Sequence, residues 1–86
     1  MDEYNVLFAR SARKELESLA QPLAFRIFSR IEALALAPRP DGCRKLQGAS
    51  NLWRIRVGDY RVLYAVDDAL RLVDVIAIRH RSDAYR

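Results

Sequence analysis

The spacing of apolar and polar residues changes near the middle of the chain. In the first half, apolar residues recur at intervals of three and four, the spacing of one face of an α-helix. In the second half they alternate with polar residues or form short runs rich in β-branched and aromatic side chains, which is typical of strands. The pattern therefore predicts helices first and an antiparallel sheet afterwards.

The first half is predicted to contain one short strand and two helices. The strand covers Tyr4–Phe8, and a helix capped by the hydroxyl of Ser11 then runs to about Ala20. A second helix begins near Pro22, a residue suited to a first helical turn, and ends before Pro38. Its apolar stripe consists of Leu23, Ala24, Ile27, Phe28, Ile31, Leu34 and Ala35. We interpret the two helices as antiparallel neighbours that bury one face each.

The second half is predicted to form a meander of three antiparallel strands: Trp53–Val57, Tyr60–Val66 and Leu70–Ile78. Gly58 and Asp59 separate the first two strands, and a two-residue loop with glycine first indicates a type II′ hairpin. Asp67–Ala69 forms the next turn. The whole chain, residues 1–86, is therefore expected to be one α+β domain. An N-terminal strand leads into two antiparallel helices packed on an antiparallel sheet.

A two-residue loop also fixes which residues of the hairpin face one another. Arg56 lies opposite Arg61, so the hairpin is expected to expose Arg54, Arg56 and Arg61 on one face. The other face carries Trp53, Ile55, Val57, Tyr60, Val62 and Tyr64, and we expect it under the helices. Like charges directly opposite one another destabilise a sheet, so this arrangement favours a site for an anion, above all a phosphate. In the simpler interpretation, these are ordinary solvent-facing residues whose stems cover the sheet.

Net charge supports a polyanionic partner. The chain has a charge of +4, and the whole excess lies in residues 44 to 61, where Arg44, Lys45, Arg54, Arg56 and Arg61 face only Asp59. Thirteen of the fifteen basic residues are arginine, whose planar fork matches phosphate oxygens. A surface that is merely soluble is the alternative.

Composition excludes several other classes of protein. Apolar residues make up 51% of the 86 and charged residues 30%, a balance typical of soluble globular domains. No apolar run approaches the about 20 residues of a membrane span, and no secretory signal is visible, so we expect a cytoplasmic protein without a membrane partner. Cys43 is the single cysteine, and no Asp, Glu or His cluster has metal-ligand spacing. We expect no metal and no small-molecule cofactor.

The C-terminal tail adds the groups best suited to proton transfer. Arg79, His80 and Arg81 close the last strand, and Tyr85 follows. A lone histidine is more often structural than catalytic, and Tyr85 can equally anchor the tail. Nevertheless, a last strand returning beside Arg61 would bring His80 and Tyr85 to the same face.

These motifs together resemble the RelE/ParE superfamily of toxins from type II toxin–antitoxin pairs. The resemblance covers nearly the whole chain and rests on four segments: Lys45-Leu46-Gln47-Gly48, Trp53-Arg54-Ile55-Arg56-Val57, Gly58-Asp59-Tyr60-Arg61-Val62-Leu63-Tyr64 and His80-Arg81-Ser82-Asp83-Ala84-Tyr85. It implies a RelE-like fold and a toxin held inactive by a cognate antitoxin. RelE-like members cleave mRNA in the ribosomal A site, whereas ParE-like members act on DNA gyrase.

The resemblance also implies a set of site residues. The catalytic set carried over by motif is Arg54, Arg56, Arg61, Arg81 and Tyr85, and the RNA-binding set is Arg44, Lys45, Arg79 and His80. A cation or aromatic residue at every catalytic place favours the RelE-like branch. The expected activity is a metal-independent endoribonuclease that uses the substrate 2′-OH, with the ribosome and mRNA as partners. A gyrase inhibitor and an RNA-binding module without catalysis remain the alternatives.

Two assignments within this set stay open. The best-known RelE type has lysines in the basic strand, and arginine cannot move protons at physiological pH, so Arg54 and Arg56 are expected to hold phosphates only. Tyr85 or His80 would transfer the proton. For the catalytic arginine of the tail we prefer Arg81, because it follows His80 in the family's His-Arg pattern, and Arg79 is the alternative.

Overall fold

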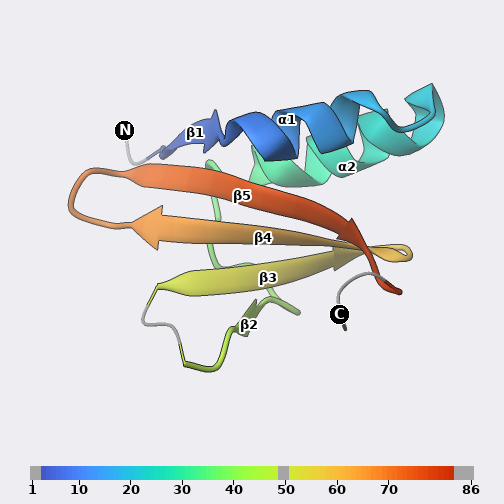
Figure 1. The fold of residues 1–86 in the computed structure, drawn as a ribbon. Coiled ribbons are helices and arrows are strands. Elements are labelled where there is room, and N and C mark those ends of the chain that lie inside the picture. The colour runs from blue at the N-terminus through green and yellow to red at the C-terminus, as the bar shows by residue number, and fades with distance from the viewer. Residues whose placement is uncertain (1–2, 49–50, 83–86) are drawn as a thin grey trace.

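The fold is two helices packed against a five-stranded sheet, as seen in a computed structural model that describes residues 3–48 and 51–82 (Figure 1). The elements in chain order are β1 (Asn5–Phe8), α1 (Arg10–Glu17), α2 (Gln21–Ala33), β2 (Arg44–Lys45), β3 (Leu52–Val57), β4 (Tyr60–Asp67) and β5 (Leu72–His80). The predicted α+β class and the antiparallel meander, β3 to β5, are confirmed. Within the described residues, no helix is long and apolar enough to cross a membrane.

The strands lie in the order β1-β5-β4-β3-β2, which makes β4 the central strand. β1 pairs with β5 in parallel, so the sheet is mixed rather than wholly antiparallel. β2 adds two residues beside β3 at the other edge. Both pairings join segments far apart in the sequence or too short to show a period, which is why the pattern did not predict them.

The predicted register of the β3–β4 hairpin is confirmed. Val57 pairs with Tyr60, Arg56 with Arg61 and Ile55 with Val62. Gly58 has a φ of +61°, which the first loop position of a type II′ turn requires.

The turn between β4 and β5 lies later than predicted. Asp67 belongs to β4, and β5 starts at Leu72 rather than Leu70. The side chain of Asp67 accepts a hydrogen bond from the N–H of Leu70 at 2.9 Å, and Arg71 takes a φ of +57°. The carboxylate thus stabilises a longer turn, and Leu70 is 66% exposed instead of forming part of the strand.

The helix boundaries also differ at one end. α1 starts at Arg10 without a side-chain cap, so the capping role predicted for Ser11 is wrong. The N–H of Ala9, the residue before the helix, still donates to the carbonyl of Val75 in β5, at 2.8 Å. The helix therefore begins directly where the β1–β5 pairing ends. α2 starts as predicted, with Pro22 in its first turn.

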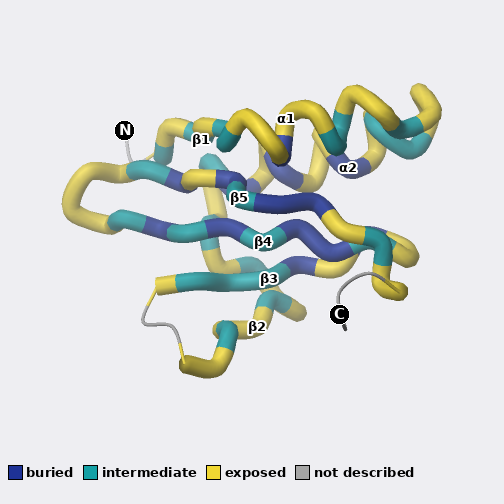
Figure 2. The backbone as a smooth tube through the Cα atoms, in the orientation of Figure 1, coloured by how far each residue is buried: buried dark blue, intermediate teal, exposed yellow. Residues whose placement is uncertain are grey.

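The core lies between α2 and one face of the sheet, as the buried positions in Figure 2 show. Its fully buried side chains come mainly from α2, β3, β4 and β5, and they include Ile27, Ile31, Leu34, Val57, Val62, Tyr64, Val66, Val73 and Val75. Phe28 departs from the predicted stripe, because it is 37% exposed and stacks on Phe8 with ring centroids 6.3 Å apart. The sheet face under the helices is thus the one predicted.

Candidate functional site

Five arginines share the sheet face that points away from the helices. The pairings that place them together are Arg44 with Arg54, Arg56 with Arg61, and Arg61 with Arg79. Directly paired residues point to the same side of a sheet, as do residues two apart in one strand. We call this set, Arg44, Arg54, Arg56, Arg61 and Arg79, the arginine face. It extends from β2 across β3 and β4 to β5.

Exposure differs strongly within the arginine face. Arg44, Arg56 and Arg79 are exposed and Arg54 is half-buried, but Arg61 retains only 6% of its accessible surface. The prediction that Arg61 is exposed is therefore wrong. Arg61 lies on the central strand with Arg56 on one side and Arg79 on the other, so long side chains flank it on both sides.

The row Arg56–Arg61–Arg79 concentrates positive charge on three neighbouring strands. Adjacent strands lie about 4.8 Å apart. Two like charges at about 5 Å repel by roughly 3 kcal/mol at an effective dielectric of about 20, although long side chains reduce this by spreading apart. A phosphate between them would replace that repulsion with attraction, and each guanidinium offers it a fork of donors.

A carboxylate from α1 lies at one end of this row. Oε2 of Glu15 is 3.5 Å from Nε of Arg79, and Oε1 accepts a hydrogen bond from the N–H of Ile78 at 2.8 Å. Glu15 was not predicted, since nothing in the helical pattern shows that α1 lies along the edge of β5 (Figure 1).

Lys45 and His80 do not belong to the arginine face. Lys45 pairs with Trp53, and its Nζ lies 6.0 Å from the centre of the indole ring. His80 pairs with Tyr60, and their rings meet edge to face at 5.2 Å. Both residues therefore point toward the helix side, because neighbours in a strand alternate between faces. The expectation that the last strand brings His80 beside Arg61 is wrong, since Arg79 takes that position.

The two remaining residues of the predicted catalytic set lie at the end of the chain. Arg81 follows β5, and its N–H donates to the carbonyl of Asp59 at 2.7 Å, which ties the tail to the hairpin loop. Tyr85 lies outside the described residues, so its predicted place beside Arg61 stays a prediction.

A second polar cluster lies at Asp68 and was not predicted. Both oxygens of Asp68 accept hydrogen bonds from Arg39, at 2.8 and 3.2 Å, and the Tyr4 hydroxyl donates to Oδ1 at 2.6 Å. The hydrogen bonds from Arg39 and then Tyr4 lower the pKa of the Asp68 carboxyl, while the bond to Asp68 raises the pKa of Tyr4. The cluster joins the N-terminal segment, the loop after α2 and the β4–β5 turn, so we assign it a structural role.

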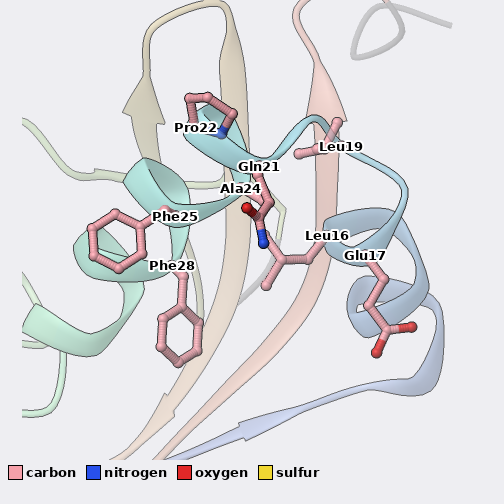
Figure 3. A pocket seen from close by; sticks show the side chains of 8 residues that line it. All are labelled: Leu16, Glu17, Leu19, Gln21, Pro22, Ala24, Phe25 and Phe28. Carbon is pink, nitrogen blue, oxygen red and sulfur yellow. The ribbon is translucent and has the colours of Figure 1, made fainter.

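The space between α1 and α2 forms an open, mostly apolar groove of about 670 Å³ (Figure 3). Its lining residues are Leu16, Glu17, Leu19, Gln21, Pro22, Ala24, Phe25 and Phe28. Glu17 is the one titratable group among them. In the part of the chain that the structure describes, no three Asp, Glu, His or Cys side chains gather where they could hold a metal ion. The arginine face is therefore the candidate site for chemistry.

Comparison with known proteins assigns the family. Residues 6–85 match the family model described as ParE toxin of type II toxin–antitoxin system, parDE. The chain belongs to the RelE/ParE superfamily of type II toxins. Two curated relatives of this toxin come from Mycobacterium tuberculosis. Toxin RelE is 32% identical over 96% of this chain and 87% of its own length, and toxin RelG is 31% identical over 96% and 97%.

Solved structures agree with this assignment. In the archaeal RelE–RelB complex from Pyrococcus horikoshii, the similar chain is 28% identical with a TM-score of 0.82, covering 92% of the toxin and 96% of that chain. In the intact E. coli RelBE toxin–antitoxin complex it is 25% identical with a TM-score of 0.79, covering 90% and 95%. The toxin therefore has the RelE fold that its motifs implied.

Proposed function

We propose that this toxin is an endoribonuclease that cleaves mRNA on the ribosome and thereby inhibits translation. The observation that carries the proposal is the arginine face, which offers cations on four adjacent strands to a phosphate backbone. The RelE names of its relatives support the same activity. Ribosomes are cytoplasmic, so the toxin acts there.

The chemistry needs no group beyond RNA and side chains. The ribose 2′-OH gives its proton to a base and attacks its own 3′ phosphate, the bond to the 5′ oxygen breaks, and that oxygen takes up a proton. Negative charge accumulates on the phosphate oxygens between bond formation and bond cleavage. Arg61 is our choice to stabilise that charge, because it is the least solvated cation of the face and ionic interactions strengthen as water is excluded. Arg54 and Arg56 hold the scissile nucleotide, and Arg44 binds an adjacent phosphate from the edge strand.

The tail supplies two further roles. Arg79 is the better candidate for the catalytic arginine of the tail, because it pairs with Arg61 on the same face, whereas Arg81 lies beyond the strand. In this assignment Arg81 has no catalytic role and helps the tail to bind RNA. Tyr85 remains the candidate for proton transfer, since His80 points to the other side of the sheet. Neighbouring cations would favour its phenolate.

The proposed partner in the resting cell is a cognate antitoxin. The similar chains in the Pyrococcus horikoshii and E. coli complexes are bound to RelB. An antitoxin that covers the arginine face would block phosphate binding directly.

Mapping mRNA ends after brief expression in cells tests the activity. The wild type is expected to cut translated codons in frame. R61A should lose at least about 99% of cutting, since one preorganised charge is worth about a hundredfold to a thousandfold in rate. Y85F should lose a similar share, since proton transfer by a positioned side chain contributes about a hundredfold or more. R30A on α2 is the control cation outside the arginine face and should cut normally. Full cutting by folded R61A and Y85F would contradict the mechanism, and intact mRNA with DNA-damage signalling would indicate gyrase as the target instead.

A further inference from the structure

Glu15 occupies a place where, among the described residues, β5 has no neighbouring strand on that side. β1 pairs with β5 only as far as Val75, which lies opposite Phe8. The chain then turns into α1, so the next part of β5 lies beside a helix (Figure 1). A strand edge without a partner leaves backbone donors that need acceptors.

The two oxygens of Glu15 divide their contacts between backbone and side chain. Oε1 accepts the N–H of Ile78 at 2.8 Å, and Oε2 lies 3.5 Å from Nε of Arg79. The backbone bond fixes the carboxylate to the residue that precedes Arg79. The Glu15 side chain is 30% exposed and that of Arg79 49%, so the side chain that holds the backbone bond is also the more covered of the two.

We propose that Glu15 is a positioning residue that holds the guanidinium of Arg79 at the β5 end of the arginine face, where Arg79 pairs with Arg61. The proposal rests on the function proposed above for that face. The contact is made through Nε, the inner nitrogen, so the two outer nitrogens can donate to phosphate oxygens. The negative charge of Glu15 also offsets part of the repulsion between Arg79 and Arg61. Arg79 can therefore stay beside Arg61 before RNA arrives.

Loss of this carboxylate should separate RNA binding from cleavage. E15Q keeps an oxygen for the Ile78 N–H but removes the charge that holds Arg79. The arginine face then has one negative charge fewer beside it, so affinity for single-stranded RNA at low salt should be equal or higher. The slope of log K against log salt should steepen by up to about 0.7. The cleavage rate should fall about tenfold to a hundredfold, because a misplacement of about 1 Å has effects of that size.

A double-mutant cycle tests the proposal on purified toxin with ribosomes that carry a short mRNA in an open A site. The single-turnover cleavage rate is measured for wild type, E15Q, R79A and E15Q/R79A. E15Q should slow cleavage when Arg79 is present and have no further effect when it is absent. E17Q, the same change two residues along α1, is the matched control and should cleave normally. The melting temperature of E15Q should stay within about 4 °C of wild type.

Three outcomes would overturn the proposal: wild-type cleavage by E15Q, an equal loss from E15Q with and without Arg79, or wild-type cleavage by R79A.

If E15Q melts at a clearly lower temperature, R79K gives the decisive measurement, because it leaves the Ile78 bond untouched and keeps the charge while removing Nε. R79K must then cleave at least about tenfold more slowly with RNA affinity within about twofold of wild type, and normal cleavage overturns the proposal. R61A separates this failure from that of the proposed function. If folded R61A also cleaves normally, the arginine face itself is not the catalytic site.

Discussion

Tyr64 links the sheet to the loop that follows α2. Its side chain is fully buried, and its hydroxyl donates a hydrogen bond to the carbonyl of Pro38 at 2.7 Å. Burial disfavours the phenolate, and with a smaller contribution from Cys43 it raises the pKa of Tyr64 well above its usual value. A single hydroxyl thus fixes the loop that presents Arg39 to Asp68.

Removal of this hydroxyl should be measurable in stability. Y64F leaves the part-buried carbonyl of Pro38 without its donor, so the free energy of unfolding should fall by about 1–2 kcal/mol in urea titrations at pH 7. Y60F, on the same strand but half-buried, is the control and should change less. No loss in Y64F would mean that water or another group replaces the hydroxyl.

Tyr64 should also make the stability of the protein depend on pH in a predictable direction. Above about pH 10, Tyr64 ionises in the unfolded chain but resists ionisation in the folded one, so the folded state binds more protons and wild-type stability falls as pH rises. Y64F should show a shallower fall over the same range. Equal slopes in the two proteins would contradict the raised pKa.

At the scale of elements, the β3–β4 hairpin sets the geometry of the candidate site. Its two-residue loop places Arg56 opposite Arg61, and a slip of one residue would turn every side chain of one strand to the other face. Gly58 is the residue that makes this loop possible. Its φ is +61°, and a methyl group added there would lie no closer than 3.8 Å to Arg26, so backbone conformation rather than space is limiting.

G58A should therefore destabilise the domain through its backbone. We expect the free energy of unfolding to fall by about 1–2 kcal/mol, because a side chain raises the energy of positive φ. D59A, the other loop residue, has no positive φ and should lose less. Denaturant unfolding of both variants is the measurement. A loss that is equal in the two variants would mean that the loop conformation does not limit stability.

Features that depend on residues close together in the chain were predicted from the sequence, whereas contacts between residues far apart were not. The hairpin register and the stripe of Ile27 and Ile31 depend on residues close in the chain, and both were predicted correctly. The contact of Glu15 with Arg79 joins positions 64 residues apart, and no local period reports it. His80 was misplaced for a related reason. Its face depends on the β4–β5 register, which a longer turn sets.

At the scale of the whole molecule, charge is distributed unevenly over a chain with a net charge of +4. The arginine face gathers five cations on one side of the sheet, with Glu15 at one end. Such a surface raises the local concentration of polyanions and steers oppositely charged partners toward it. An antitoxin with acidic residues would meet this face first.

Association with the antitoxin should accordingly depend on salt. We expect the antitoxin to place at least one Asp or Glu against Arg54, Arg56, Arg61 or Arg81, or to displace the Tyr85 tail from them. The association rate should fall steeply between low and high salt, since screening acts over about 8 Å at physiological ionic strength. Stopped-flow measurements on wild type, R56A and the α1 control R13A test this, and R56A should show the weaker dependence. A rate indifferent to salt would mean that inhibition does not work through the arginine face.

The position of β5 in the sheet determines when the arginine face can form during synthesis. β5 lies between β1 and β4, so it joins the first strand to the rest of the sheet and contributes Val73, Val75 and Ile78 to the core. A growing chain that ends before residue 72 lacks the strand that joins β1 to the rest of the sheet, and it lacks Arg79 as well. During synthesis the toxin can therefore complete neither its core nor its arginine face until β5 has left the ribosome.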